Sequence, residues 1–290
     1  MKRVASRVSP LKILMDGIAF GESPRWHDSR LWFCDWGAEE LIAVDLDGRH
    51  KVVTRVHSFP FSIDWLPDGR LLIVSARDRA VLTTDSAGSL VTYADLSAFG
   101  RRLPGNEIVA DGRGNAYVNG AGFNLMAGEK FAPGIVALVA PDGSARQVAD
   151  GMHFPNGMAV TPDSSTLIVA ESYAHRLTAF DIAADGSLLN RRVWAALGDG
   201  TPDGICLDDE GAAWYADVPN ERCVRVREGG EVLQTVEVDR GCFACMLGGI
   251  DGRTLFIVAR EWRGIQSTAD GERTGQVLTT RAPAPHAGRP

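Results

Sequence analysis

The sequence predicts an all-β fold, a six-bladed β-propeller with a central metal-binding channel. Two observations carry the fold: a hairpin pattern that recurs six times, and weak helical periodicity throughout. In each repeat a short apolar run reaches an acidic turn and a second apolar run follows, with successive turn aspartates 40 to 52 residues apart. Self-similarity at that period is typical of a β-propeller. The six segments are Gly21–Trp36, Ser62–Ser75, Asn106–Asn119, Asn156–Ser172, Asp203–Asp217 and Cys245–Ala259.

Outer strands are expected between these hairpins, at turns such as Asp47-Gly48 and Asp185-Gly186 that favour β-hairpins. Two longer insertions interrupt the pattern, Phe99–Gly105 and Gly120–Pro133. Because long loops in a compact domain are more often functional than accidental, we expect both to rim the channel mouth. The expected outer strands are Glu40–Asp45, Lys51–His57, Val81–Thr84, Ile135–Val139, Leu177–Asp181 and Val224–Arg227.

The chain is predicted to form one domain over residues 1–290, because six blades of about 45 residues use nearly all of it. Residues 1–12 are expected to form an arm that supplies a strand to the last blade and closes the ring, which removes an open edge strand. The Pro/Ala-rich tail, residues 281–290, is expected to be disordered.

Composition limits the partners and the compartment. The formal net charge of −7 argues against a nucleic-acid partner, which would leave a basic footprint. No apolar run reaches transmembrane length, so no membrane partner is expected. The five cysteines form no secreted disulfide framework, which favours a cytoplasmic location. Cys242 and Cys245 are expected to be buried or to face the channel, and the oligomeric state stays open.

Overlaying the repeats brings one position of each blade to the channel, about six residues before the turn aspartate. Four of the six residues there carry a carboxylate or amide oxygen, and such an all-oxygen set suits Ca²⁺, Mg²⁺ or Mn²⁺. Two carboxylates about 4 Å apart repel by roughly 4 kcal/mol at an effective dielectric of about 20, which also favours a cation. The alternative is that these polar residues merely begin strands. The positions are Glu22, Ser62, Asn106, Asn156, Asp203 and Cys245.

Three motifs in order resemble the gluconolactonase/regucalcin (senescence marker protein) family. Gly21–Trp26 (GESPRW) resembles its GE-[SG]-P-x-W segment, Phe154–Met158 (FPNGM) its P-N-G motif, and Pro202–Cys206 (PDGIC) its P-D-G segment. The resemblance covers residues 12–262. It implies a six-bladed propeller with one divalent cation in its channel, Ca²⁺ first, with Mg²⁺, Mn²⁺ or Zn²⁺ as alternatives.

By the family pattern, Glu22, Asn156 and Asp203 would hold the cation, and Asp203 would also act as general acid/base. Asn106 stands where the family has an Asn that contacts the metal, its water or the substrate. Sugar-lactone members carry Arg and Asp where this chain has Pro104 and Glu107. That departure puts an aldonolactone substrate in doubt, because Arg is a planar fork suited to several sugar oxygens.

The sequence-based hypothesis is a metal-dependent hydrolase that opens a lactone, a small-molecule cyclic ester, by attack of a metal-bound water. A related propeller hydrolase of phosphotriesters and a non-enzymatic calcium-binding propeller remain as alternatives. The residues expected to contact substrate are Asn106, Glu107, Phe123, His153 and Tyr173. Met126 and Trp36 could extend an apolar wall with Phe123 and Tyr173, although core packing is the default for all four and a lone His such as His153 is more often structural.

Overall fold

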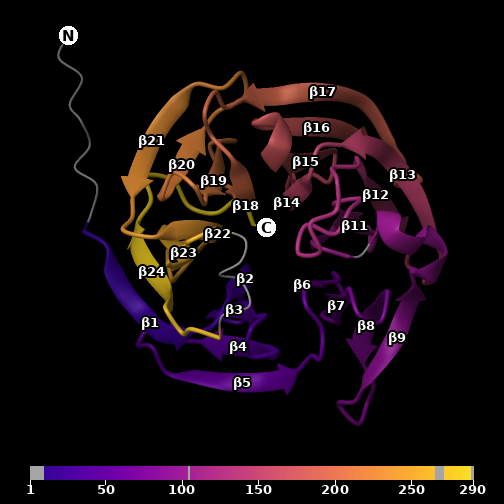
Figure 1. Ribbon diagram of the computed structural model, residues 1–290, viewed down its shortest axis with the longest axis horizontal. Helices are drawn as coiled ribbons and strands as arrows, with labels where there is room; N and C mark the ends of the chain where they lie inside the picture. The colour runs from indigo at the N-terminus through magenta and orange to yellow at the C-terminus, as the bar shows by residue number, and fades with distance from the viewer. Residues whose placement is uncertain (1–9, 104, 265–270, 289–290) are drawn as a thin grey trace.

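The computed structural model describes residues 10–103, 105–264 and 271–288 and forms six four-stranded antiparallel sheets. Figure 1 shows these sheets as blades around a common centre. The innermost strands of neighbouring blades contact one another around the ring. The predicted six-bladed propeller is therefore confirmed. The innermost strands are β2 (Gly21–His27), β6 (Phe61–Trp65), β10 (Ile108–Ala110), β14 (Pro155–Val160), β18 (Pro202–Leu207) and β22 (Gly241–Gly248).

The other strands follow outward in each blade. The second strands are β3 (Arg30–Asp35), β7 (Leu71–Ser75), β11 (Ala116–Gly120), β15 (Thr166–Glu171), β19 (Ala213–Asp217) and β23 (Thr254–Arg260). The third are β4 (Glu40–Val44), β8 (Ala80–Thr84), β12 (Gly134–Val139), β16 (Arg176–Ile182), β20 (Arg222–Val226) and β24 (Gly275–Arg281). The outermost are β5 (His50–Arg55), β9 (Leu90–Asp95), β13 (Ala145–Met152), β17 (Leu188–Ala196), β21 (Val232–Glu237) and β1 (Lys12–Ile18).

The core lies between the blades. Strands β18 and β22 are buried along their whole length, whereas the outermost strand β5 has no buried residue. A sheet packed on both faces needs near-continuous apolar runs rather than alternation. Leu41 of the first blade and Phe61 of the second share one apolar cluster, and Tyr117 and Met158 link the third and fourth. This packing holds the starts of the innermost strands in place.

The N-terminal strand β1 pairs with β24, from Lys12 opposite Thr279 to Ile18 opposite Gly275, and completes the sixth blade. Ring closure by an N-terminal strand occurs as predicted, although the strand spans 12–18 and residues 1–9 of the predicted arm lie outside the described residues. No helix in the described part of the chain is long and apolar enough to cross a membrane.

The C-terminal tail differs from its prediction. Residues 282–287 pack against turns of the last two blades instead of being disordered: Ala282 N donates to Arg253 O at 2.7 Å and Ala287 N to Leu207 O at 3.0 Å. Ala284 is fully buried. Proline has no N–H to satisfy, so a Pro/Ala-rich segment can be held by few hydrogen bonds. Composition alone misses such partners.

Candidate functional site

Three of the predicted ligands occupy the same place in their blades. Glu22, Asn156 and Asp203 are the second residues of β2, β14 and β18. The residues before them pair equivalently, Pro155 with Glu171 and Pro202 with Asp217. In all three strands a register shift follows the oxygen-bearing residue. Such bulges re-aim a side chain at the end of a ladder, so here they set these oxygens at one mouth of the channel.

The two predicted amides lie against each other. Asn106 Nδ2 donates to Asn156 Oδ1 at 3.3 Å, and Asn156 Nδ2 donates to Ser172 Oγ at 3.5 Å. Asn119, which the sequence analysis did not single out, donates from Nδ2 to Asn156 O at 2.6 Å. Its place opposite Asn106 in the third repeat was the signal that could have found it. These contacts fix the amide side of the site.

The two carboxylates of the site are buried and share negative surroundings. Burial, and after it the charges of Asp203 and Glu107, raise the pKa of Glu22 well above its ordinary value. Burial and the charge of Glu107 likewise raise the pKa of Asp203, against a hydrogen bond from Asn156 that lowers it. Asp203 Oδ1 is buried without a hydrogen-bond partner among the described residues. An unpartnered buried carboxylate oxygen is costly, and a cation would satisfy it.

The donor set fits a hard divalent cation. It offers carboxylate oxygens from Glu22 and Asp203 and amide oxygens from Asn106 and Asn156, the ligand types that Ca²⁺ accepts in flexible geometry. Within the described ranges, no group of three or more His, Cys, Asp or Glu side chains is placed to hold a metal. The site must therefore rely on amide as well as carboxylate oxygens, which argues against a zinc site of the usual His/Cys kind.

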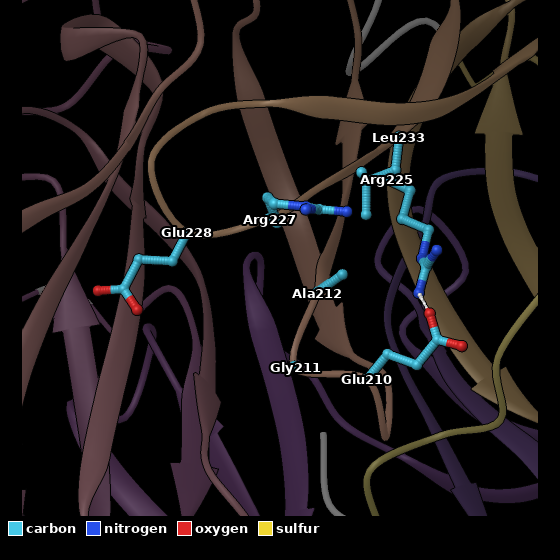
Figure 2. A pocket seen from close by; sticks show the side chains of 7 residues that line it. All are labelled: Glu210, Gly211, Ala212, Arg225, Arg227, Glu228 and Leu233. Atoms are coloured by element: carbon cyan, nitrogen blue, oxygen red, sulfur yellow. Dashed lines mark hydrogen bonds and ion pairs between the residues drawn. The ribbon is translucent and has the colours of Figure 1, made fainter. Parts of the chain in front are cut away.

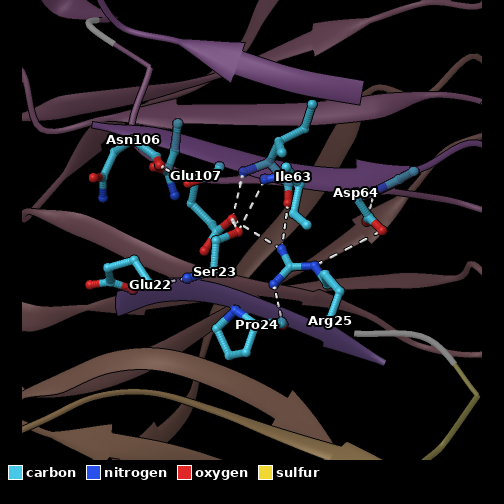
Figure 3. Close-up of polar contacts among 12 residues, drawn as sticks. Glu22, Ser23, Pro24, Arg25, Ile63, Asp64, Asn106 and Glu107 are labelled. Atoms are coloured by element: carbon cyan, nitrogen blue, oxygen red, sulfur yellow. Dashed lines mark hydrogen bonds and ion pairs between the residues drawn. The ribbon is translucent and has the colours of Figure 1, made fainter. Parts of the chain in front are cut away.

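Glu107, predicted to contact substrate, is held in place by three hydrogen bonds to one of its two carboxylate oxygens (Figure 3). Its Oε1 accepts hydrogen bonds from Arg25 Nη2 at 3.0 Å, Ser23 Oγ at 3.2 Å and Ile108 N at 2.9 Å. Arg25 was missed by the sequence analysis. The overlay could have found it, because the register puts the uncharged Ala159 and Cys206 at the equivalent places of other blades.

The sixth repeat was overlaid three residues too far along. Gly241 pairs with Arg260 as Pro202 pairs with Asp217, so Cys242 rather than Cys245 is equivalent to Asp203. Strand β22 is eight residues long, and counting back about six residues from the turn stops short of its start. Both cysteines are buried thiols, and Cys245 Sγ donates to Gly204 O at 3.6 Å.

Aromatic side chains gather in two groups beside the strand starts. In the first, Tyr173 stacks on Phe154 at 4.8 Å and lies 6.0 Å from Phe123, between ring centroids. Phe131 joins them and brings in the His153 ring at 5.2 Å. Three predicted substrate residues are thus brought together, next to Asn156. The second group contains Trp36 with Phe20, Phe59, Phe243 and Trp262.

A fully buried carboxylate, Glu171, supports the first aromatic group. It accepts a hydrogen bond from His153 N at 2.7 Å and pairs with Arg176 at 2.8 Å and Arg191 at 3.2 Å. Burial alone would raise the pKa of Glu171, but hydrogen bonds from Thr178 and His153 and the charge of Arg176 outweigh it and lower the pKa. Glu171 therefore belongs to an ionic network that also ties down the backbone of His153.

A surface hollow of about 400 Å³ lies elsewhere on the molecule (Figure 2). It is close to the far end of β18 from Asp203, and its Arg225 is paired with Glu210 at 2.7 Å. None of the predicted site residues lines it. The candidate site is instead at the channel, where the buried Asp203 Oδ1 has no hydrogen-bond partner among the described residues. The hollow is lined by Glu210, Gly211, Ala212, Arg225, Arg227, Glu228 and Leu233.

The family model described as the SMP-30/Gluconolactonase/LRE-like region matches residues 20–261, which is most of the chain. The chain belongs to this family. Among curated relatives, a 6-deoxy-6-sulfogluconolactonase from Pseudomonas putida is 30% identical over 50% of this chain and 52% of its own. A regucalcin from Gallus gallus is 31% identical over 53% and 56%. These matches span about half the length of the relatives.

Solved structures of family members share the fold. A luciferin-regenerating enzyme aligns with a TM-score of 0.79 at 18% identity, over 96% of this chain and 98% of its own. A gluconolactonase from Xanthomonas campestris aligns with a TM-score of 0.77 at 23% identity, over 95% and 90%. At these identities the likeness supports the propeller architecture alone.

Proposed function

We propose that this SMP-30/gluconolactonase-family chain is a metal-dependent hydrolase that opens a lactone ring, with Asp203 as general acid/base. One observation carries the proposal: Asp203 Oδ1 is buried and unpartnered in the described structure, in a mouth that it shares with Glu22 and Asn156. Relatives named as a sulfogluconolactonase and a gluconolactonase support the reaction class.

In this mechanism Glu22, Asn156 and Asp203 would hold the cation, and Asn106 would orient water or substrate. When bound, the cation would polarise the lactone carbonyl and lower the pKa of the attacking water. Asp203 takes a proton from that water as it attacks and returns a proton to the departing alkoxide.

The substrate's body would lie against the first aromatic group. Phe123, Tyr173 and the neighbouring His153 offer an apolar wall beside Asn156, and Tyr173 is 45% exposed. Arg101 is paired with Glu129 at 2.9 Å, and its side chain is 83% exposed. Pro104 lies outside the described residues. A lactone with few hydroxyl groups suits this surface better than a sugar lactone.

We assign Ca²⁺ as the cation, with Mg²⁺, Mn²⁺ and Zn²⁺ as the alternatives to test. An all-oxygen donor set favours it, and a family structure from Agrobacterium tumefaciens is described as a calcium-binding regucalcin. We also propose a cytoplasmic location, since all five cysteines are free thiols.

Phosphotriester hydrolysis is the second candidate function. The observation that favours it is a diisopropyl-fluorophosphatase from Loligo vulgaris, 26% identical over 60% of this chain and 61% of its own. A non-enzymatic calcium-binding role is the third, because several relatives carry the name regucalcin.

One assay separates these functions. The purified protein is stripped with a chelator, and acid release is followed on lactones and on phosphotriesters with each metal added back. Metal-restored lactone hydrolysis supports the proposal, and phosphotriester turnover alone favours the second candidate. Cation binding without turnover of either class supports the third. The Asp208→Asn variant, altered at the opposite end of β18, serves as the activity control.

A further inference from the structure

A buried arginine lies beside the proposed cation site, where a positive charge should hinder cation binding. Arg25 is 4% exposed and sits three residues after Glu22 in the same strand. Its Nη2 donates to Glu107 Oε1 at 3.0 Å and to Ile108 O at 2.7 Å, and its Nη1 donates to Pro24 O at 2.9 Å. Arginine stays charged in proteins. The site must therefore accommodate this charge rather than lose it.

Glu107 is placed to offset that charge. It follows Asn106 directly in the chain, and it accepts a hydrogen bond from Ser23, the neighbour of Glu22 (Figure 3). Glu107 is thus linked to two residues of the proposed cation site: to Asn106 along the chain, and to Glu22 through Ser23. All three of its hydrogen bonds reach Oε1. Asp64 flanks the guanidinium on another side, with Oδ1 3.9 Å from Arg25 Nε, and accepts backbone N–H groups of Trp65 and Ala110.

The same contacts join three blades at the channel. Arg25 belongs to the first blade, Asp64 to the second and Glu107 to the third. Ser23 Oγ adds a link by accepting Ile63 N at 3.1 Å. A charged network that spans blades can fix the spacing of strand starts as well as their charge.

We propose that Arg25 and Glu107 form a charge-balancing pair that positions the starts of β2 and β10 and sets the electrostatic field at the cation site. Arg25 holds Glu107 in place, and Glu107 cancels the repulsion that Arg25 would exert on a cation. This inference rests on the cation site proposed above. Both are positioning residues, and neither is assigned a part in the reaction.

The test is a cycle of four proteins: wild type, Glu107→Gln, Arg25→Met and the double variant. Each is stripped with a chelator and titrated with CaCl₂ by isothermal calorimetry. Glu107→Gln leaves Asp64, 3.9 Å away, as the remaining carboxylate beside Arg25 and so removes part of the charge balance, and Ca²⁺ affinity should fall about tenfold. Arg25→Met should not weaken binding. The double variant removes both charges and should return to within about threefold of wild-type affinity.

The recovery is what a purely structural role would not produce. If the network mattered only for packing, the double variant would bind Ca²⁺ as poorly as Glu107→Gln or worse, and that result overturns the proposal. Unchanged affinity in Glu107→Gln overturns it as well. If a variant that carries Arg25→Met fails to fold, as its melting temperature would show, the Ca²⁺ affinities of Glu107→Gln and of the control variant Asp208→Asn decide the question.

A matched control is available in another buried pair of the chain. Arg225 and Asp208 are 2.7 Å apart, with side chains 7% and 0% exposed, at the far end of β18. Asp208→Asn should lower the melting temperature but leave Ca²⁺ affinity within about twofold of wild type. If wild type itself binds no Ca²⁺, Mg²⁺, Mn²⁺ or Zn²⁺, the proposed function fails. If wild type binds and Glu107→Gln binds equally, only the pairing inference fails.

Discussion

The buried carboxylates of this propeller lie in two opposite kinds of electrostatic surroundings. Glu171 ends β15 among hydrogen-bond donors and two arginines, and its pKa is lowered. Glu22 and Asp203 begin inner strands in surroundings dominated by burial and other carboxylates, and their pKa values are raised. Two arginines thus balance the charge of Glu171, whereas Glu22 and Asp203 have too little positive charge around them to lower their pKa values.

The difference separates structural from functional acids. A carboxylate surrounded by arginines and N–H groups stabilises the fold in its charged form. A carboxylate pair left short of positive charge destabilises the cation-free fold, which is tolerable where a ligand offsets the cost. The same substitution, acid to amide, should therefore have opposite effects in the two regions.

The largest expected effect is on turnover in the channel. Asp203→Asn removes the acid/base group while keeping its size, so kcat for the best lactone should fall by about a thousandfold or more. Circular dichroism and the melting temperature should show an intact fold. Full activity in this variant would reject Asp203 as the acid/base and reduce the channel pair to a structural feature.

The next largest effect is on stability at the supporting acid. Glu171→Gln loses two ion pairs and leaves Arg176 and Arg191 without their shared partner. We expect urea denaturation to show a loss of about 2 kcal/mol, below the full value for a buried pair because both arginines are partly exposed. An unchanged unfolding free energy would remove the contrast between the two regions.

The pH dependence of that loss follows from the lowered pKa of Glu171. The folded-state pKa lies below the ordinary value of 4.5, so the stabilisation is complete above pH 4.5 and disappears as pH falls through the lowered pKa. The stability gap between wild type and Glu171→Gln should be constant near neutral pH and narrow below about pH 4.5. A stability difference between the two proteins that grows as the pH falls would contradict the lowered pKa of Glu171.

The sequence predicted the repeat, and the proximity of Glu22, Asn156 and Asp203, far better than the contacts around them. Glu22, Asn156 and Asp203 could be found because a propeller places equivalent positions together. Cys245 was misplaced because a bulge and a longer strand changed the count in the sixth blade. The pairing of Arg25 with Glu107 could not be predicted, because the two are 82 residues apart and only the closed ring brings them into contact.

In the channel, an acid-to-amide change is expected to raise the free energy of unfolding, by less than Glu171→Gln lowers it. Glu22→Gln removes one of two like charges that burial forces together. The chelator-stripped variant should be more stable than stripped wild type by about 1 kcal/mol in urea denaturation. Added Ca²⁺ should reverse the order, since the variant loses a proposed ligand. If the stripped variant were less stable than stripped wild type, the charged form of Glu22 would be stabilised by its surroundings, as that of Glu171 is.

The smallest expected effect tests whether the support from Glu171 reaches the substrate. Tyr173 lies two residues after Glu171, stacks on Phe154 and is 45% exposed. Tyr173→Ala should raise KM for lactones with apolar substituents about threefold and leave kcat unchanged, because it removes contact area rather than a reacting group. Leu189→Ala, which removes a 51% exposed side chain from the outermost strand β17, is the control and should change neither constant. A fall in kcat with KM unchanged would instead place Tyr173 in the reaction itself.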